Sequence, residues 1–173
     1  MTMLRVMAAF ALLSWAIPGP ALAAPAAPAF TFKRLDGGGT FDSRSLIGKQ
    51  VLLIRFQASW CKVCGPEADE LERTWVRYRP AGLTVVAIQV EDTEADARRF
   101  LRAHGATYPA GLDPRLQIAN RFGAKGTPYT VVVNTRGEIV ARIAGRVSEA
   151  RLAQVLDPLL KKPSPRKPPA RLQ

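Results

Sequence analysis

The chain has 173 residues and a formal net charge of +11 at pH 7, with one histidine and two cysteines. Its length suits one domain with a sizeable core. No basic run alternates with aromatic residues, so the charge does not indicate a nucleic-acid-binding protein. The few cysteine and histidine ligands argue against a structural zinc site, and there is no glycine-rich phosphate loop. We therefore expect no metal and no cofactor.

The first 23 residues have the pattern of a secretory signal peptide. Arg5 gives a positive start, Val6 to Ile17 form an apolar stretch, and Ala21-Leu22-Ala23 is a small-residue cleavage site. The apolar stretch is short for a membrane span and ends at a proline, so cleavage is favoured over a retained anchor. Export would place the mature chain in an oxidising compartment.

The rest of the chain divides by composition into three parts. Residues 24–29 are an Ala/Pro segment, predicted to be a mobile spacer. Residues 30–160 have the mixed composition of a folded domain. Residues 161–173 contain four prolines, five basic residues and no acid, which predicts a disordered tail. This tail is either simply solvated or contacts anionic lipid headgroups or an acidic partner.

Alternating strand and helix patterns run through the domain. A hairpin is predicted around the glycine-rich turn at 36–39, and the apolar runs 51–57 and 83–90 predict strands buried on both faces. A helix should begin at Cys64, with Leu71, Trp75 and Tyr78 on its buried face, and a second should begin at Asp92 or Thr93.

The C-terminal half continues the alternation. Residues 108–112 are expected to be a connection, and Pro114 to start a helix that ends near Gly123. Residues 129–133 and 138–144 predict a hairpin, and Ser148 should cap a last helix.

The two cysteines stand in the segment Trp60-Cys61-Lys62-Val63-Cys64, between a predicted strand and a predicted helix. This spacing at a helix start is typical of a dithiol–disulfide redox centre. The helix N-terminus and the charge of Lys62 should favour the thiolate of Cys61, which would attack a partner disulfide before Cys64 resolves the mixed disulfide. An inert structural disulfide is the alternative, but a loop of two residues would constrain the unfolded chain very little.

The chain resembles the thioredoxin superfamily, and in particular its exported bacterial branch, the TlpA/ResA/CcmG-type thiol–disulfide oxidoreductases. The matching segments are 41–49, 51–64, 83–90, 126–133 and 134–145. The resemblance implies an α/β thioredoxin-like fold, with a central mixed sheet flanked by helices, an N-terminal β-hairpin and a central insert.

The resemblance also implies roles for residues near the cysteines. Gly126-Thr127-Pro128 matches the loop with a cis proline that faces the cysteines, so the backbone of Thr127 would pair with an extended substrate. Trp60, Lys62 and Val63 would surround the pair. An acid just past the second strand, Asp92 or its neighbour Glu91, would tune the cysteines, although Asp92 could equally begin a helix.

Three features depart from the family pattern. Arg55 stands where thioredoxins carry a buried acid that serves proton transfer, and we expect it to reach the surface or to pair with Glu91 or Asp92. Gly65-Pro66 follows the second cysteine, which predicts an irregular helix start. His104 precedes a glycine at a predicted helix end, where a terminal role is favoured over catalysis.

The sequence thus favours a periplasmic, monomeric enzyme that keeps cysteines of exported apocytochromes or copper-site proteins reduced. Its expected partners are exported protein thiols or disulfides and a membrane electron donor of the DsbD/CcdA kind. One alternative is a copper-binding chaperone module that uses Cys61 and Cys64 as soft ligands. A thiol peroxidase is a third possibility, but the proline and threonine that precede the peroxidatic cysteine in that family are missing.

Overall fold

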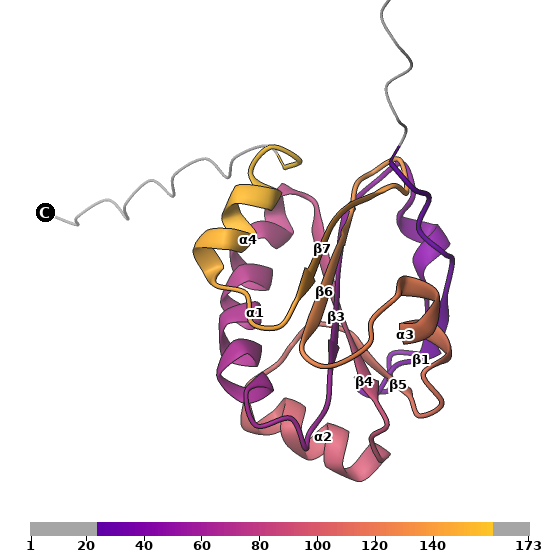
Figure 1. The fold of residues 1–173 in the computed structure, drawn as a ribbon, viewed down its shortest axis with the longest axis vertical. Coiled ribbons are helices and arrows are strands. Elements are labelled where there is room, and N and C mark those ends of the chain that lie inside the picture. Colours follow the sequence, from indigo (N-terminus) through magenta and orange to yellow (C-terminus); the bar gives the residue numbers. More distant parts are fainter. Residues whose placement is uncertain (1–23, 161–173) are drawn as a thin grey trace, which may run out of the picture.

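The computed structural model describes residues 24–160, in which a five-stranded mixed sheet lies between helices (Figure 1). The strands are β1 (Thr31–Lys33), β2 (Thr40–Asp42), β3 (Val51–Gln57), β4 (Leu83–Val90), β5 (Ala110–Asp113), β6 (Tyr129–Val133) and β7 (Ile139–Ala144). The helices are α1 (Cys64–Tyr78), α2 (Glu94–Ala103), α3 (Gln117–Phe122) and α4 (Glu149–Leu156), with short 3₁₀ turns η1 (Ser43–Leu46) and η2 (Arg79–Ala81).

The main sheet has the strand order β5-β4-β3-β6-β7. Strands β3, β4 and β5 run parallel, whereas β6 is antiparallel to both β3 and β7. Strands β1 and β2 form a separate antiparallel hairpin. The predicted fold class, a thioredoxin-like mixed sheet with an N-terminal hairpin, is confirmed.

Strand β3 is central, and its side chains alternate between two cores. Leu52, Ile54 and Phe56 contribute to the core under the hairpin and α3, which also contains both cysteines. Val51 and Leu53 contribute to the core under α1 and α4. Because side chains alternate along a strand, Arg55 points to the α1 side. The cysteines therefore pack with Leu52, Ile54 and Phe56, whereas Arg55 lies on the opposite face of β3.

Three local predictions were wrong. The Ala/Pro spacer is tied down: Ala26 bridges Glu138, and the amide of Ala27 donates to the Gly137 carbonyl at 2.8 Å. The expected connection at 108–112 contains edge strand β5, which pairs with β4. Helix α3 starts at Gln117 rather than Pro114, because the carboxylate of Asp113 accepts the amide hydrogens of Gln117, Ile118 and Ala119 at 2.8–2.9 Å.

The predicted signal peptide (1–23) and basic tail (161–173) lie outside the described residues. Within residues 24–160, no helix combines the length and apolar character needed to cross a bilayer.

Candidate active site

The two cysteines occupy the junction between β3 and α1. Their sulfurs form a disulfide, with 5.4 Å between the Cα atoms. The amide of Cys61 donates to the Ala58 carbonyl at 3.2 Å, and that of Cys64 donates to the Cys61 carbonyl at 3.0 Å. Cys61 retains 8% of its surface and Cys64 retains none. Of the two cysteines, Cys61 is therefore the one that keeps contact with solvent.

Helix α1 begins at Cys64 and continues without interruption to Tyr78, so the irregular start predicted from Gly65-Pro66 was wrong. Pro66 lies in the first turn, where an amide hydrogen has no partner within the helix in any case. In the described part of the chain, no side chain caps this end of α1. The free N–H groups and the helix dipole favour a negative charge next to the cysteines.

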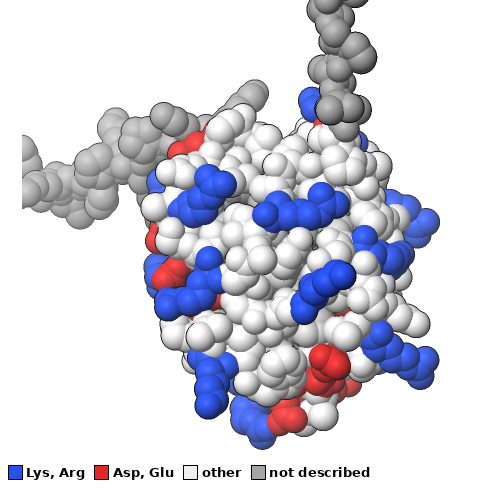
Figure 2. Space-filling view, viewed as in Figure 1, with Lys and Arg blue, Asp and Glu red and all other residues white. Residues whose placement is uncertain are grey.

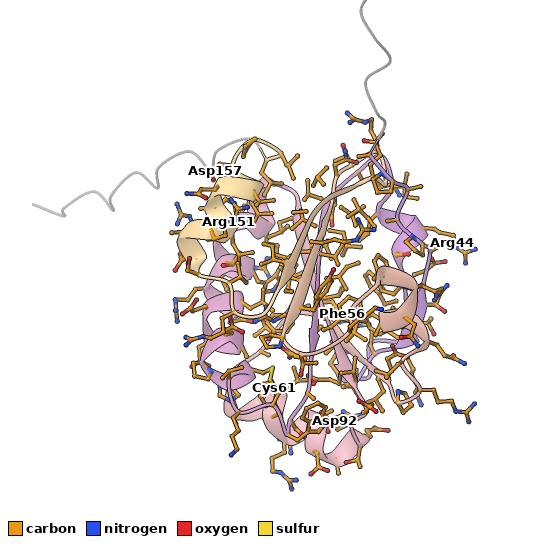
Figure 3. All side chains as sticks on the ribbon, in the orientation of Figure 1. Arg44, Phe56, Cys61, Asp92, Arg151 and Asp157 are labelled. Carbon is orange, nitrogen blue, oxygen red and sulfur yellow. A yellow bond between two sulfur atoms is a disulfide. The ribbon has the colours of Figure 1, made fainter. Side chains whose placement is uncertain are left out.

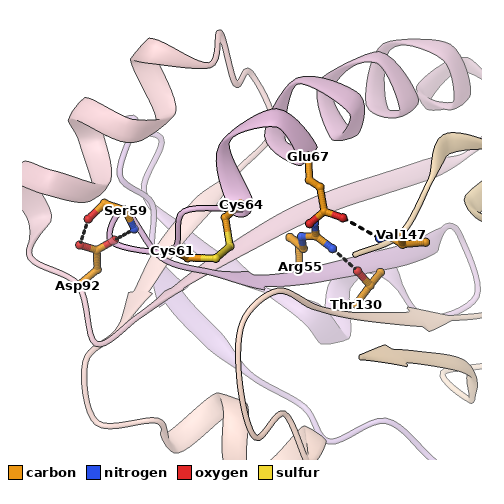
Figure 4. The surroundings of a disulfide bond; sticks show 8 residues. All are labelled: Arg55, Ser59, Cys61, Cys64, Glu67, Asp92, Thr130 and Val147. Atoms are coloured by element: carbon orange, nitrogen blue, oxygen red, sulfur yellow. Dashed lines mark hydrogen bonds and ion pairs between the residues drawn. A yellow bond between two sulfur atoms is a disulfide. The ribbon is translucent and has the colours of Figure 1, made fainter. Parts of the chain in front are cut away.

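A buried ion pair lies beside the disulfide (Figure 4). The guanidinium of Arg55 donates from Nη2 to Glu67 and from Nη1 to Thr130 Oγ1, the latter at 2.7 Å. The other oxygen of Glu67 accepts the amide hydrogen of Val147 at 2.6 Å. Both charged side chains are 2% exposed. Burial lowers the pKa of Arg55 below its ordinary value, and the negative charge of Glu67 counteracts this shift.

The prediction for Arg55 was therefore wrong. The Arg55 side chain neither reaches the surface nor pairs with Glu91 or Asp92. Glu67 was not among the residues predicted for the site. A signal was present, since Glu67 follows Cys64 by three positions and precedes Leu71 by four. That spacing puts it on the buried side, where a charge needs a partner.

Asp92 lies on the other side of the cysteine pair (Figure 4). Its carboxylate accepts the amide hydrogen of Ser59 at 2.8 Å and the hydroxyl of Ser59 at 2.7 Å. Helix α2 is capped instead by Thr93, whose Oγ1 accepts the amide hydrogen of Asp96 at 3.1 Å. Asp92 is therefore not the cap of α2, and its two bonds to Ser59 instead hold the loop that leads to Cys61.

Glu91 contributes through its backbone. Its carbonyl accepts the indole N–H of Trp60 at 3.3 Å, and its φ of 48° lies in the left-handed region. The Trp60 ring is held in this way although 57% of the residue is exposed. Lys62 and Val63, the two residues between the cysteines, are also exposed.

A pocket of about 350 Å³ brings three of the predicted residues together: Trp60, Glu91 and Thr127. Its remaining lining comes from β3, β4, α3 and the loop that follows α3, as Phe56, Val90, Leu116, Ala119, Asn120, Ala124, Lys125 and Gly126. The Thr127–Pro128 peptide bond is cis, as the sequence suggested, and Pro128 is buried. The pocket therefore combines apolar side chains with Thr127, the residue before the cis peptide bond.

His104 ends α2, as expected, but its ring extends to the first turn of α1. Nδ1 lies 2.9 Å from Oδ1 of Asp69, and the ring centroid is 4.7 Å from that of Phe100. A Cβ atom at Gly65 would come within 2.9 Å of the ring, so glycine here leaves the imidazole its place. Within residues 24–160, no group of three or more His, Cys, Asp or Glu side chains could hold a metal ion.

A Cys-x-x-Cys disulfide between the central strand and the first long helix of a thioredoxin-like sheet defines a thiol–disulfide oxidoreductase. The chain belongs to the AhpC/TSA family, whose model matches residues 24–142. It is 33% identical over 141 residues to the thiol:disulfide interchange protein HelX of Rhodobacter capsulatus, covering 81% of this chain and 78% of that one.

Two further comparisons agree with this assignment. The thiol-disulfide oxidoreductase ResA of Halalkalibacterium halodurans is 27% identical over 120 residues, covering 69% of this chain and 68% of ResA. A thioredoxin-family thiol:disulfide interchange protein from Chlorobium tepidum superposes with a TM-score of 0.71 at 23% identity, covering 79% of this chain and 96% of that one. This last comparison supports the fold.

Proposed function

We propose that this protein reduces disulfides in exported proteins by using the Cys61–Cys64 pair in its dithiol form. The observation that carries the proposal is the unequal exposure of the two cysteines at the uncapped start of α1. A partially exposed Cys61 thiolate can reach a partner protein, whereas Cys64 is reached only from within the site. The names of the relatives, thiol:disulfide interchange protein and thiol-disulfide oxidoreductase, agree with this chemistry.

The exchange takes two steps. The Cys61 thiolate attacks one sulfur of the partner disulfide; a Cys61–partner bond forms, the partner disulfide breaks, and the released sulfur takes a proton. The thiolate of Cys64 then attacks Cys61, closes the protein disulfide and releases the second partner sulfur as a thiol. Two electrons pass to the partner, and the Cys61–Cys64 pair becomes oxidised.

Substrate contact is assigned to the surface around Trp60, Lys62, Val63 and the Thr127–Pro128 bond. In this proposal the backbone of Thr127 pairs with an extended segment of the substrate, and the pocket beside Trp60 receives a neighbouring side chain. Asp92 and Glu91 support the loop that presents Cys61.

The setting of the reaction follows from the N-terminal sequence. Residues 1–23 direct the chain to the periplasm, where cysteines of apocytochromes or copper-site proteins need reduction. A membrane donor of the DsbD/CcdA kind would regenerate the dithiol. The basic tail would reach anionic lipid headgroups, and the protein would act as a monomer.

The equilibrium potential of the Cys61–Cys64 pair tests the proposed direction. It can be titrated in defined thiol buffers and read out by alkylation of the free thiols. A value below about −230 mV would support a reductant, whereas a value above about −150 mV would indicate an oxidase or isomerase. Absence of a reversible disulfide, together with tight Cu(I) binding by the reduced protein, would replace this proposal with the copper-binding module.

A further inference from the structure

A groove of about 660 Å³ lies along the N-terminal hairpin, apart from the cysteine pair. One wall is the segment Ala29–Leu35, which includes all of β1. The other wall comes from the end of β5, the loop after it and α3. Six basic side chains line the groove: Lys33, Arg34, Arg44, Arg98, Arg115 and Arg121. Figure 2 shows basic side chains along the same edge of the molecule, where Figure 1 has β1, η1 and α3.

The acidic side chains that line the groove already have partners within the protein. Its two acidic lining residues are Glu94, which pairs with Arg98 at 2.7 Å, and Asp113, whose carboxylate accepts three amide hydrogens of α3. Arg34 and Arg44 pair with the neighbouring Asp36 and Asp42.

Three cations remain without a carboxylate partner among the described residues: Lys33, Arg115 and Arg121. Lys33 lies on the β1 wall, and Arg115 and Arg121 lie on the opposite wall. The groove therefore presents uncompensated positive charge from both sides.

The edge of β1 that faces the groove is open. Phe30 and Arg34 use their backbone groups toward β2, through the bonds to Ser43 at 3.0 Å and to Gly39 at 2.9 Å, and Phe32 pairs with Phe41 between them. Because backbone groups alternate in direction along a strand, those of Thr31 and Lys33 point away from β2.

Both ends of this edge are already bonded. Arg121 donates to the Ala29 carbonyl at 2.8 Å, and Arg98 donates to the Leu35 carbonyl. The amide of Leu35 also donates to the Ala110 carbonyl at 2.8 Å. Within residues 24–160, the outward backbone groups of Thr31 and Lys33 have no such partner. They form a short template for one more strand, held at each end by an arginine.

We propose that this groove is a docking site for an extended, acidic segment of a partner protein, which adds to the hairpin as a third strand beside β1. The open backbone groups of Thr31 and Lys33 would provide the strand pairing. Acidic side chains at alternate positions of the segment would meet Lys33 on one side and Arg115 and Arg121 on the other.

The site is separate from the redox chemistry. Helix α3 contributes to both hollows: Gln117, Ile118 and Arg121 line the groove, whereas Ala119 and Asn120, with Leu116 just before the helix, line the pocket beside Trp60. Docking needs no free thiol, so it can be measured on the disulfide form, and its failure would leave the proposed reductase function untouched.

The test uses a nine-residue probe peptide of alternating Glu and Val with blocked ends, titrated into the ¹⁵N-labelled protein at low salt. One control peptide carries Lys in place of Glu. A second has the same charge but two central prolines, which prevent strand pairing. We expect the amide signals of Thr31, Lys33 and α3 to shift with the first peptide alone, and the affinity to fall as salt is added.

Variants separate this groove from general charge attraction. Lys33→Glu and Arg115→Glu should each weaken binding roughly three- to tenfold. Arg151→Glu changes the net charge equally but lies on α4, on the other side of the molecule (Figure 3), and should leave the affinity unchanged. Thr31→Pro removes an outward N–H and should abolish the shifts around β1.

Three results would overturn the proposal: no binding of the Glu/Val peptide, equal binding of the proline peptide, or equal loss of affinity in Arg151→Glu. The two charge reversals lie at exposed positions, so they keep the test valid if Thr31→Pro fails to fold.

Discussion

Glu67 and Asp92 are carboxylates on opposite sides of the cysteine pair, and their charges are compensated in different ways (Figure 4). Glu67 is 2% exposed and faces the guanidinium of Arg55, so the pair is neutral as a whole. Asp92 is 9% exposed, and within residues 24–160 its carboxylate receives hydrogen bonds only from Ser59, which is a neutral donor. The burial of a carboxylate is thus compensated by an opposite charge at Glu67 and by neutral donors at Asp92.

The largest effect is expected when Arg55 is replaced. Arg55→Met removes the cation and leaves the Glu67 carboxylate buried without its ion-pair partner. Such a change typically costs about 3–5 kcal/mol, which is a large share of the stability of a small domain. Denaturant unfolding of the disulfide form at neutral pH measures the loss.

A double variant provides the control for this prediction. Arg55→Met combined with Glu67→Leu removes both charges and should recover most of the stability. If Arg55→Met alone unfolds like the parent protein, the ion pair does not stabilise the fold as its burial implies.

The second largest loss of stability is expected for Glu67→Gln. The glutamine side chain keeps the shape of glutamate and can still accept the Val147 amide hydrogen, but it no longer neutralises Arg55. Loss of a charge-assisted hydrogen bond should cost about 1.5–3 kcal/mol. The extra positive charge should also favour the cysteine thiolates, so alkylation of the reduced protein at neutral pH should become faster.

Glu70→Gln is the matched control for this change. Glu70 lies about one turn further along α1 and is half-buried, whereas Glu67 is buried. An equal change of alkylation rate in both variants would show that the position of Glu67 has no special effect on the cysteines.

Asp92→Asn should have a smaller effect on stability, about 1 kcal/mol, because the amide oxygen can still accept the Ser59 amide hydrogen. The main result should be chemical. Loss of this negative charge near the Cys61 loop should favour the thiolate of Cys61, seen as faster alkylation of Cys61 in a Cys64→Ser background. Asp96→Asn, on α2, controls for the change in net charge. A decrease in the rate would contradict an electrostatic role for Asp92.

The contrast between these two carboxylates also shows what the sequence could predict. The bounds of β3, β4 and β6, and the start of α1, followed from apolar runs and from the motif itself, because local patterns determine them. Asp92, two residues past the end of β4, was named only because the family resemblance implies an acid at this place. The roles of Trp60 and Thr127 also followed from the resemblance, and the pocket that both residues line was not predicted.

The ion pair between Arg55 and Glu67 could not be predicted from apolar runs, from the motif or from the family resemblance. Arg55 and Thr130 are 75 positions apart, and their contact depends on the antiparallel register of β3 with β6. Val147 reaches Glu67 from a loop 80 positions away. Similarly, α3 starts later than Pro114 suggested because the Asp113 carboxylate caps it. The contacts of Thr130 and Val147 depend on how the sheet is assembled, which sequence spacing does not record, whereas the Asp113 contacts are local.

The smallest effect concerns a third acid near the cysteines, Asp69, which is 50% exposed on its side chain and bonds to His104. Gly65→Ala would bring a Cβ atom within 2.9 Å of the far end of the His104 ring, so the ring must turn away from Asp69. Loss of an exposed pair costs up to about 1 kcal/mol, but alanine gains a similar amount over glycine within a helix. We therefore expect the stability of Gly65→Ala to stay within about 0.5 kcal/mol of the parent.

A second background separates the two opposing contributions. In His104→Ala the ring is absent, so Gly65→Ala should now stabilise the protein by the full helix preference, about 0.5–1 kcal/mol. Denaturant midpoints of the four proteins give the coupling between the two sites directly. Equal effects of Gly65→Ala in both backgrounds would mean that the ring moves freely and that the Asp69 contact adds nothing. A larger effect in the His104→Ala background would show that even this exposed pair holds α2 against the helix that carries the cysteines.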